Sequence, residues 1–140
     1  MLDVKCWTSR VTQGDHPHEV PDNAKLWRRV SPIHVASDGL GPSSAAFAGH
    51  SDDGKTSVCV AEIAGTPDEM MEGWDGHWLV QFTVGDARSA GFGIEITAGE
   101  YEGHANLVWG GTRSARKRAQ QKLAEACRRH GWIIRREDHG

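Results

Sequence analysis

Basic residues follow a glycine pair near the end of the chain, in a pattern suited to binding anions. The set consists of Gly110, Gly111, Thr112, Arg113, Arg116 and Lys117. Glycines before a helix leave backbone N–H groups accessible, and a helix start is a natural place for a phosphate. Each cation at that end costs the helix about 0.3–1 kcal/mol, and sequences often break local rules at functional sites. We interpret the set as a candidate anion site, against the alternative that these side chains pair with the chain's own acids or extend into solvent.

Charge is unevenly distributed along the 140 residues. From Thr112 onward nine Lys and Arg face three acids, a net charge of +6, whereas the first 111 residues carry −9. Such asymmetry indicates either an anionic partner for one end or mutual neutralisation of the two halves.

A second set of residues permits an enzymatic hypothesis. Arg28, Ser44 and Glu95 follow the order arginine, serine, acid, which resembles that of compact ADP-ribosyltransferase-like and NAD-cleaving domains. The resemblance implies an arginine on the pyrophosphate, a serine orienting the ribose and a carboxylate stabilising positive charge at the breaking bond. The alternative is that Ser44 caps a turn and Arg28 lies on one face of a strand.

Metal and thiol chemistry have weaker support. The eight histidines form no H-E-x-x-H motif and the cysteines no paired C-x-x-C motif, so we expect no metal site. His77 and His104 each open a predicted strand and could lie next to one another. Cys6, Cys59 and Cys127 are odd in number and widely spaced, which favours reduced thiols in a cytoplasmic protein, the last two as core residues.

Alternating and β-branched runs predict the strands that must position these residues. They fall at residues 26–30, 56–63, 77–84, 92–97 and 104–109. Residues 85–91 read as a connector or a single helical turn, and residues 132–134 pack back or add a strand. Residues 1–24, a strand at 4–11 and a loop, form an N-terminal extension, and residues 25–140 form one domain.

Two helices are expected. A short one begins after Thr66, where Pro67 fits the first helical position and Glu69 completes a capping box. A long one runs from a Thr112 cap to a Gly131 stop, with apolar residues at helical spacing. The sequence therefore predicts an α+β fold, a mainly antiparallel sheet with one short helix and one long C-terminal helix packed on it. No apolar run approaches the roughly 20 residues of a membrane span.

Residues 66–130, read as helix, three strands, helix, resemble double-stranded-RNA-binding domains. Gly85, Arg88 and Phe92 lie near the spacing of that family's Gly-Pro-x-His-x-x-x-Phe loop and second strand. The final helix is similar to the family's basic, alanine-rich helix, which contacts phosphates across the RNA major groove. Asp86 stands at the loop proline and Arg88 at the histidine, so the loop contact is not implied.

A longer stretch, residues 26–132, resembles an uncharacterised family of small bacterial proteins, which implies a shared fold and no reaction. The matching segments are Leu26-Trp27-Arg28-Arg29-Val30-x-Pro32, Pro42-Ser43-Ser44-Ala45-Ala46-Phe47, Ser57-Val58, Phe82-Thr83-x-Gly85-x-Ala87-Arg88-x-x-Gly91 and His104-Ala105.

The sequence thus favours a small non-enzymatic binding domain that takes up a polyanion, such as nucleic acid, at the basic start of its last helix, without a cofactor. Two alternatives stay open. One is an NAD-using enzyme that depends on Arg28, Ser44 and Glu95, and the other is an interaction module that docks an acidic protein.

Overall fold

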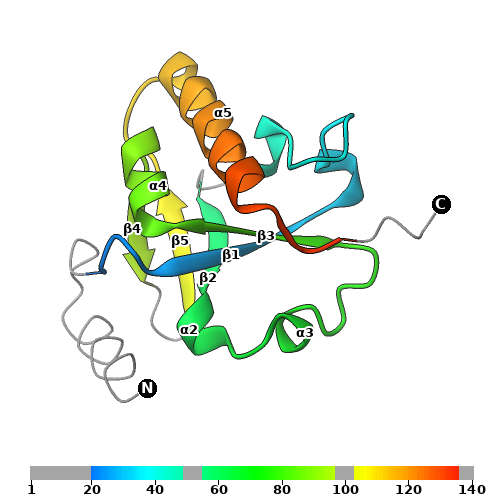
Figure 1. Ribbon diagram of the computed structural model, residues 1–140. Coiled ribbons are helices and arrows are strands. Elements are labelled where there is room, and N and C mark those ends of the chain that lie inside the picture. Colours follow the sequence, from blue (N-terminus) through cyan, green and yellow to red (C-terminus); the bar gives the residue numbers. More distant parts are fainter. Residues whose placement is uncertain (1–19, 49–54, 97–102, 136–140) are drawn as a thin grey trace.

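The computed structural model describes residues 20–48, 55–96 and 103–135. The strand expected at residues 4–11 and Cys6 lie outside these ranges. Within them the fold is α+β, as predicted: a six-stranded antiparallel sheet carries the long C-terminal helix on one face (Figure 1).

The sheet has the strand order β4-β5-β2-β1-β3-β6. Its strands are β1 (Lys25–Val30), β2 (Thr56–Val60), β3 (Trp78–Thr83), β4 (Gly93–Ile96), β5 (His104–Val108) and β6 (Trp132–Ile134). The segment after the last helix therefore adds a strand, at the edge beside β3. β1 pairs with β3 along its whole length but with β2 only at Leu26↔Val60 and Trp27↔Cys59.

More short helices form than the single one predicted. The described residues contain α2 (Ala61–Ala64), α3 (Pro67–Met70), α4 (Val84–Ala90) and the long α5 (Arg113–His130), with 3-10 turns η2 (Pro32–His34) and η3 (Ser44–Phe47). The capping box of Thr66 and Glu69 at the start of α3 is confirmed.

Two predicted boundaries were wrong. The strand expected to reach residue 63 ends at Val60, and Ala61–Ala64 turns into α2 because alanine and glutamate favour helix over strand. The connector at residues 85–91 is α4, a seven-residue helix whose start is capped by Thr83. Thr83 and Asp86 form a second capping box, with both N–H···O distances at 3.0 Å.

The order helix, three strands, helix expected over residues 66–130 is not observed. α4 intervenes between β3 and β4, and β1, β2 and β5 separate these two strands within the sheet. β3 pairs instead with β1 and β6, so the three strands do not form one consecutive antiparallel unit.

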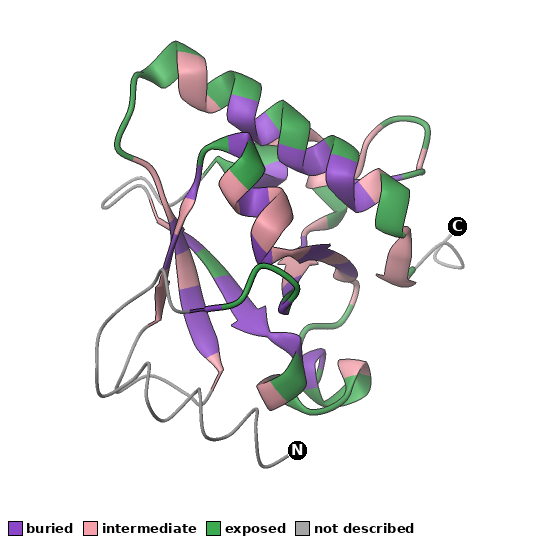
Figure 2. Cartoon of the chain, turned by 60° about the vertical axis from the view of Figure 1, so that its left-hand side comes forward, coloured by how far each residue is buried: buried purple, intermediate pink, exposed green. Residues whose placement is uncertain are grey.

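The sheet buries apolar side chains on both faces. On one face α5, α4 and η3 cover a large core that includes Leu26, Phe47, Phe82 and Leu123. α5 turns its buried side to this core and its exposed side to solvent (Figure 2). On the other face a smaller cluster consists of Trp27, Cys59, Ala61, Met70, Met71 and Leu79. Cys59 and Cys127 are both buried, as predicted.

Residues 20–24, which the sequence analysis assigned to the N-terminal extension, pack against α4. Val20 is fully buried in the large core, and its carbonyl accepts a 2.8 Å hydrogen bond from Arg88 Nη1. The same guanidinium forms a 2.6 Å ion pair with Asp22.

Candidate functional site

The last helix forms where the sequence predicted it. Thr112 caps its start, because the threonine Oγ1 accepts a 3.2 Å hydrogen bond from the Ala115 N–H. Leu123 and Cys127 lie on its buried side, and Gly131, with φ of 83°, ends it. These local signals fix which side chains α5 presents to solvent.

Five Lys and Arg residues of α5 are exposed. Four of them lie in its first ten residues, Arg113, Lys117, Arg118 and Lys122, and the fifth, Arg129, lies near its end. The first four span about 14 Å along the axis at 1.5 Å per residue. Among the residues that the structure describes, none of the four forms an ion pair with a carboxylate. We call these four residues the α5 cationic face.

Arg116, which the sequence analysis grouped with Arg113 and Lys117, lies differently. Its side chain is partly buried, and its Nε atom is shielded from solvent. Its place on the helix explains this, because it falls on the side of Ala119, Leu123 and Cys127 rather than opposite them. Arg118 and Lys122, which the sequence analysis left out of the site, occupy the exposed positions instead.

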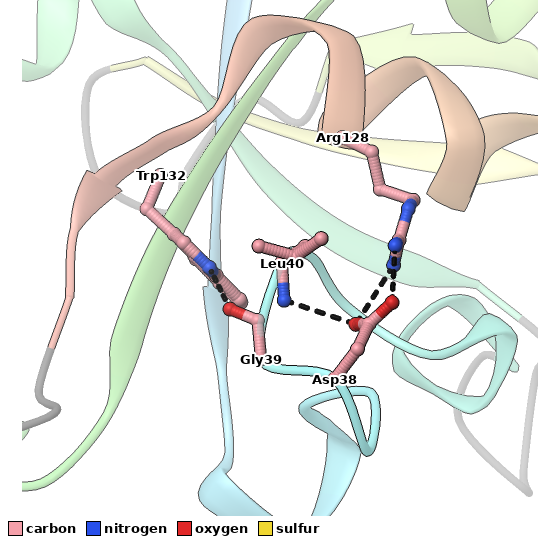
Figure 3. Close-up of polar contacts among 5 residues, drawn as sticks. All are labelled: Asp38, Gly39, Leu40, Arg128 and Trp132. Carbon is pink, nitrogen blue, oxygen red and sulfur yellow. Dashed lines mark hydrogen bonds and ion pairs between the residues drawn. The ribbon is translucent and has the colours of Figure 1, made fainter.

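Two basic residues near the end of α5, Arg128 and His130, contact carboxylates of the chain itself. The Arg128 guanidinium donates hydrogen bonds to both carboxylate oxygens of Asp38, and Asp38 Oδ1 also accepts a 3.0 Å hydrogen bond from the Leu40 N–H (Figure 3). The hydrogen bond from Arg128 holds the pKa of the Asp38 carboxyl below its ordinary value. His130 Nε2 lies 2.9 Å from Asp86 Oδ2. Neutralisation by the body is thus observed for Arg128, whereas the neighbouring Arg129 is exposed.

The loop that carries Asp38 is attached at two further points. Trp132 Nε1 donates a 2.9 Å hydrogen bond to the Gly39 carbonyl (Figure 3). A Cβ at Gly41 would lie 2.4 Å from Arg128 Cγ, so only glycine lets the arginine stem cross the loop at this distance.

Of the two glycines before α5, only Gly111 is required by packing. A Cβ at Gly111 would lie 3.0 Å from the Trp109 ring, whose Nε1 donates a 3.0 Å hydrogen bond to the Thr112 carbonyl. A Cβ at Gly110 would meet nothing within 4 Å. Gly111 is therefore explained by Trp109, and the exposed cations carry the argument for anion binding.

The residues of the enzymatic hypothesis do not gather at one place. Arg28 lines a pocket beside β1, whereas neither Ser44 nor Glu95 is among the residues that line it. Ser44 begins η3, and Glu95 forms a 2.8 Å ion pair with Lys55. The order of the three residues along the chain is not matched by proximity in the fold.

That pocket contains polar residues that sequence spacing did not group. Ser57 Oγ lies 2.8 Å from His104 Nε2, and His34 and His77 are also in the lining. His77 and His104 therefore share a pocket, although β1 and β2 separate the strands β3 and β5 that they adjoin. The signal available in the sequence was the position of both histidines at strand starts.

Neither metal-binding clusters nor membrane spans occur in the part of the chain that the structure describes. There, no three His, Cys, Asp or Glu side chains are placed to share a metal ion. None of the described helices has both the length and the apolar character needed to cross a membrane. Comparisons of the chain with models of protein families, with curated proteins and with solved structures found no match.

Proposed function

We propose that this protein binds nucleic acid through the α5 cationic face. The observation that carries the proposal is the concentration of exposed cations in the first half of one helix. Arg113, Lys117, Arg118 and Lys122 are exposed without a carboxylate partner among the described residues. Near the other end Arg128 and His130 contact Asp38 and Asp86, and Arg129 is the one further exposed Lys or Arg of α5.

Placing cations at this end opposes helix stability, which favours a role outside folding. The start of a helix already carries about half a positive charge, and Arg113 and Lys117 form a like-charged i,i+4 pair. No acid lies in the first turn to compensate. A phosphate backbone, with one negative charge per roughly 1.7 Å of duplex, supplies the missing counter-charge.

Counterion release gives the proposal a quantitative test. Four phosphate contacts predict that log K for a DNA duplex falls with log salt with a slope of about −3.6. Between about 50 and 200 mM salt the affinity should therefore fall about 150-fold. Fluorescence anisotropy of a labelled duplex, and of the matching RNA duplex, measures the slope.

Two double variants, each lacking two positive charges, distinguish an effect of the α5 cationic face on binding from an effect of the net charge of the protein. R113Q/K117Q should lower the magnitude of the slope by about 2, since two phosphate contacts are lost. R88Q/R128Q removes the same charge from residues paired with Asp22 and Asp38, and should leave the slope unchanged. Equal effects of the two variants, or binding without salt dependence, would refute the proposal.

The two other functions predict different outcomes in the same experiments. A module for acidic proteins would bind poly-glutamate and not the duplexes. An NAD-using enzyme would consume NAD and lose that activity on substitution of Arg28, Ser44 or Glu95. Only salt-sensitive duplex binding that depends on Arg113 and Lys117 supports the proposal.

A further inference from the structure

A pocket opens where two central strands separate. β1 and β2 pair only at Leu26↔Val60 and Trp27↔Cys59, so the residues after Trp27 and before Cys59 are not paired with each other. A cavity of about 450 Å³ lies there. Its lining comes from β1, β2, the start of β5, both 3-10 turns and the segment from Met70 to His77.

The central polar group of this pocket is the Arg28 guanidinium. Its Nε donates a 2.7 Å hydrogen bond to the Ala46 carbonyl, and its Nη1 a 2.7 Å hydrogen bond to the Ser57 carbonyl. Both acceptors are neutral, and no carboxylate of the described residues forms an ion pair with Arg28. Burial lowers the pKa of Arg28 from its ordinary value to about 10, which reflects a charge removed from water without full compensation.

The Arg28 guanidinium still has N–H groups that can donate hydrogen bonds to a ligand. Five N–H groups are present in the side chain, and the two bonds to carbonyls use two of them. An incompletely compensated buried charge is costly, and a bound anion removes that cost. The Arg28 fork matches the two oxygens of a carboxylate or a phosphate.

The other polar residues of the lining suit the same ligand. Arg29 donates a 2.9 Å hydrogen bond from Nε to the Met70 carbonyl, and its guanidinium carbon lies 4.5 Å from the centre of the Trp74 ring. The Ser57 hydroxyl is in an exposed residue and is positioned by His104. The described lining includes two arginines and three histidines and no carboxylate.

We propose that this pocket binds a small molecule through a phosphate or carboxylate group, with Arg28 as the principal partner and Arg29 and Ser57 as further donors. Trp74 is 42 % exposed and lines the same pocket, so the part of its ring that Arg29 and His77 do not cover can contact the rest of the ligand. This site is separate from the α5 cationic face, since the pocket lining contains no residue of α5.

Titration of the ¹⁵N-labelled protein with inorganic phosphate, and in parallel with acetate, tests the proposal by NMR. Saturable shifts of the Trp74 indole and of the Arg28 Nε–H signals are expected, with a Kd on the order of 1 mM or tighter. The anion with the lower Kd identifies the head group. Shifts that stay linear with both anions, or that arise on α5 instead, would overturn the proposal.

Variants link the binding to named donors. R28M removes the principal partner but also two structural hydrogen bonds, and R29Q removes one, to Met70, so S57A serves as the main test and R29Q as the second. S57A keeps the backbone carbonyl that Arg28 needs, and R29Q keeps a polar side chain. Each should raise the Kd several-fold, whereas R113Q/K117Q should leave it unchanged. If S57A and R29Q both bind as the unmodified protein does, the assignment of the pocket is wrong.

Discussion

The side chain of Arg28 connects β1 to β2 through the carbonyl of Ser57, with an Nη1–O distance of 2.7 Å. These strands pair through their backbones only at Leu26↔Val60 and Trp27↔Cys59. The same guanidinium holds η3 through the Ala46 carbonyl. A side chain therefore bridges the separated part of the sheet.

Replacing Arg28 with methionine should lower the free energy of unfolding by about 2 kcal/mol, because two charge-assisted hydrogen bonds are lost. R29M loses one such bond, to Met70, and should cost about half as much. Urea denaturation monitored by circular dichroism measures both. A loss for R28M no larger than that for R29M would mean that the bridge does not stabilise the sheet.

Arg113→Glu should make the protein more stable while weakening its binding to nucleic acid. A carboxylate at the start of α5 interacts favourably with the helix dipole and forms an i,i+4 pair with Lys117, a gain of about 1 kcal/mol. For a chain of this size the thermal midpoint should rise by about 2–4 °C. Calorimetry and duplex binding are measured on the same preparation. The thermal midpoint of R113Q should lie between those of the unmodified protein and R113E. A lower midpoint for R113E would show that Arg113 has a structural role.

Gly91→Ala should destabilise the protein by about 2–3 kcal/mol. Gly91 ends α4 with φ of 113°, and an added Cβ would lie 2.9 Å from the Trp109 ring. Gly110→Ala is the matched control, since its Cβ would meet no atom within 4 Å. We expect this control to change stability by less than about 0.5 kcal/mol. Equal denaturation midpoints for the two variants would contradict the packing described for Trp109.

Acid should weaken the junction of α4 and α5 through Asp86. Burial raises the pKa of this carboxyl, but hydrogen bonds from Thr83 and His130 outweigh burial and hold the pKa below its ordinary value. As the pH falls, Asp86 is therefore protonated first in the unfolded chain. The free energy of unfolding begins to decrease below about pH 4, the ordinary pKa of aspartate, and the loss continues through the lower pKa of Asp86 in the folded state.

Thermal unfolding of D86N between about pH 5 and 2 checks this behaviour. D86N should be less stable than the unmodified protein at pH 5, and the difference should narrow as the pH falls. D75N, which removes an exposed carboxylate elsewhere, should keep the full acid dependence. Parallel curves of thermal midpoint against pH for the unmodified protein and D86N would show that Asp86 does not cause the loss of stability in acid.

Local patterns were sufficient to predict α5, the first five strands and the capped start of α3. Each depends on neighbours in sequence, such as the Thr112 cap and the Gly131 stop. The length of α4 was underestimated, because its N-terminal cap, Thr83, is also the last residue of β3 and so gave no separate signal for a helix start. The exposed positions of Arg118 and Lys122 follow from the direction in which α5 turns its apolar side.

The sequence patterns did not predict which strands, far apart along the chain, pair with one another. The strand order is set by contacts such as β1 with both β2 and β3, which no local spacing encodes. The pocket has the same origin, since Ser57 lies 29 residues from Arg28 and 47 from His104. Equally, the distribution of charge indicated either an anionic partner or mutual neutralisation of the two halves, but not which cations the body neutralises.

The order of the elements along the chain also determines when the large core closes during synthesis. α5 packs on η3, β3 and α4, and β6 pairs with β3, so the covering helix and an edge strand leave the ribosome after all their partners. At about 5–20 residues per second, adding residues 113–134 takes on the order of seconds. For that interval the apolar sheet face that α5 covers in the folded protein has no helix over it.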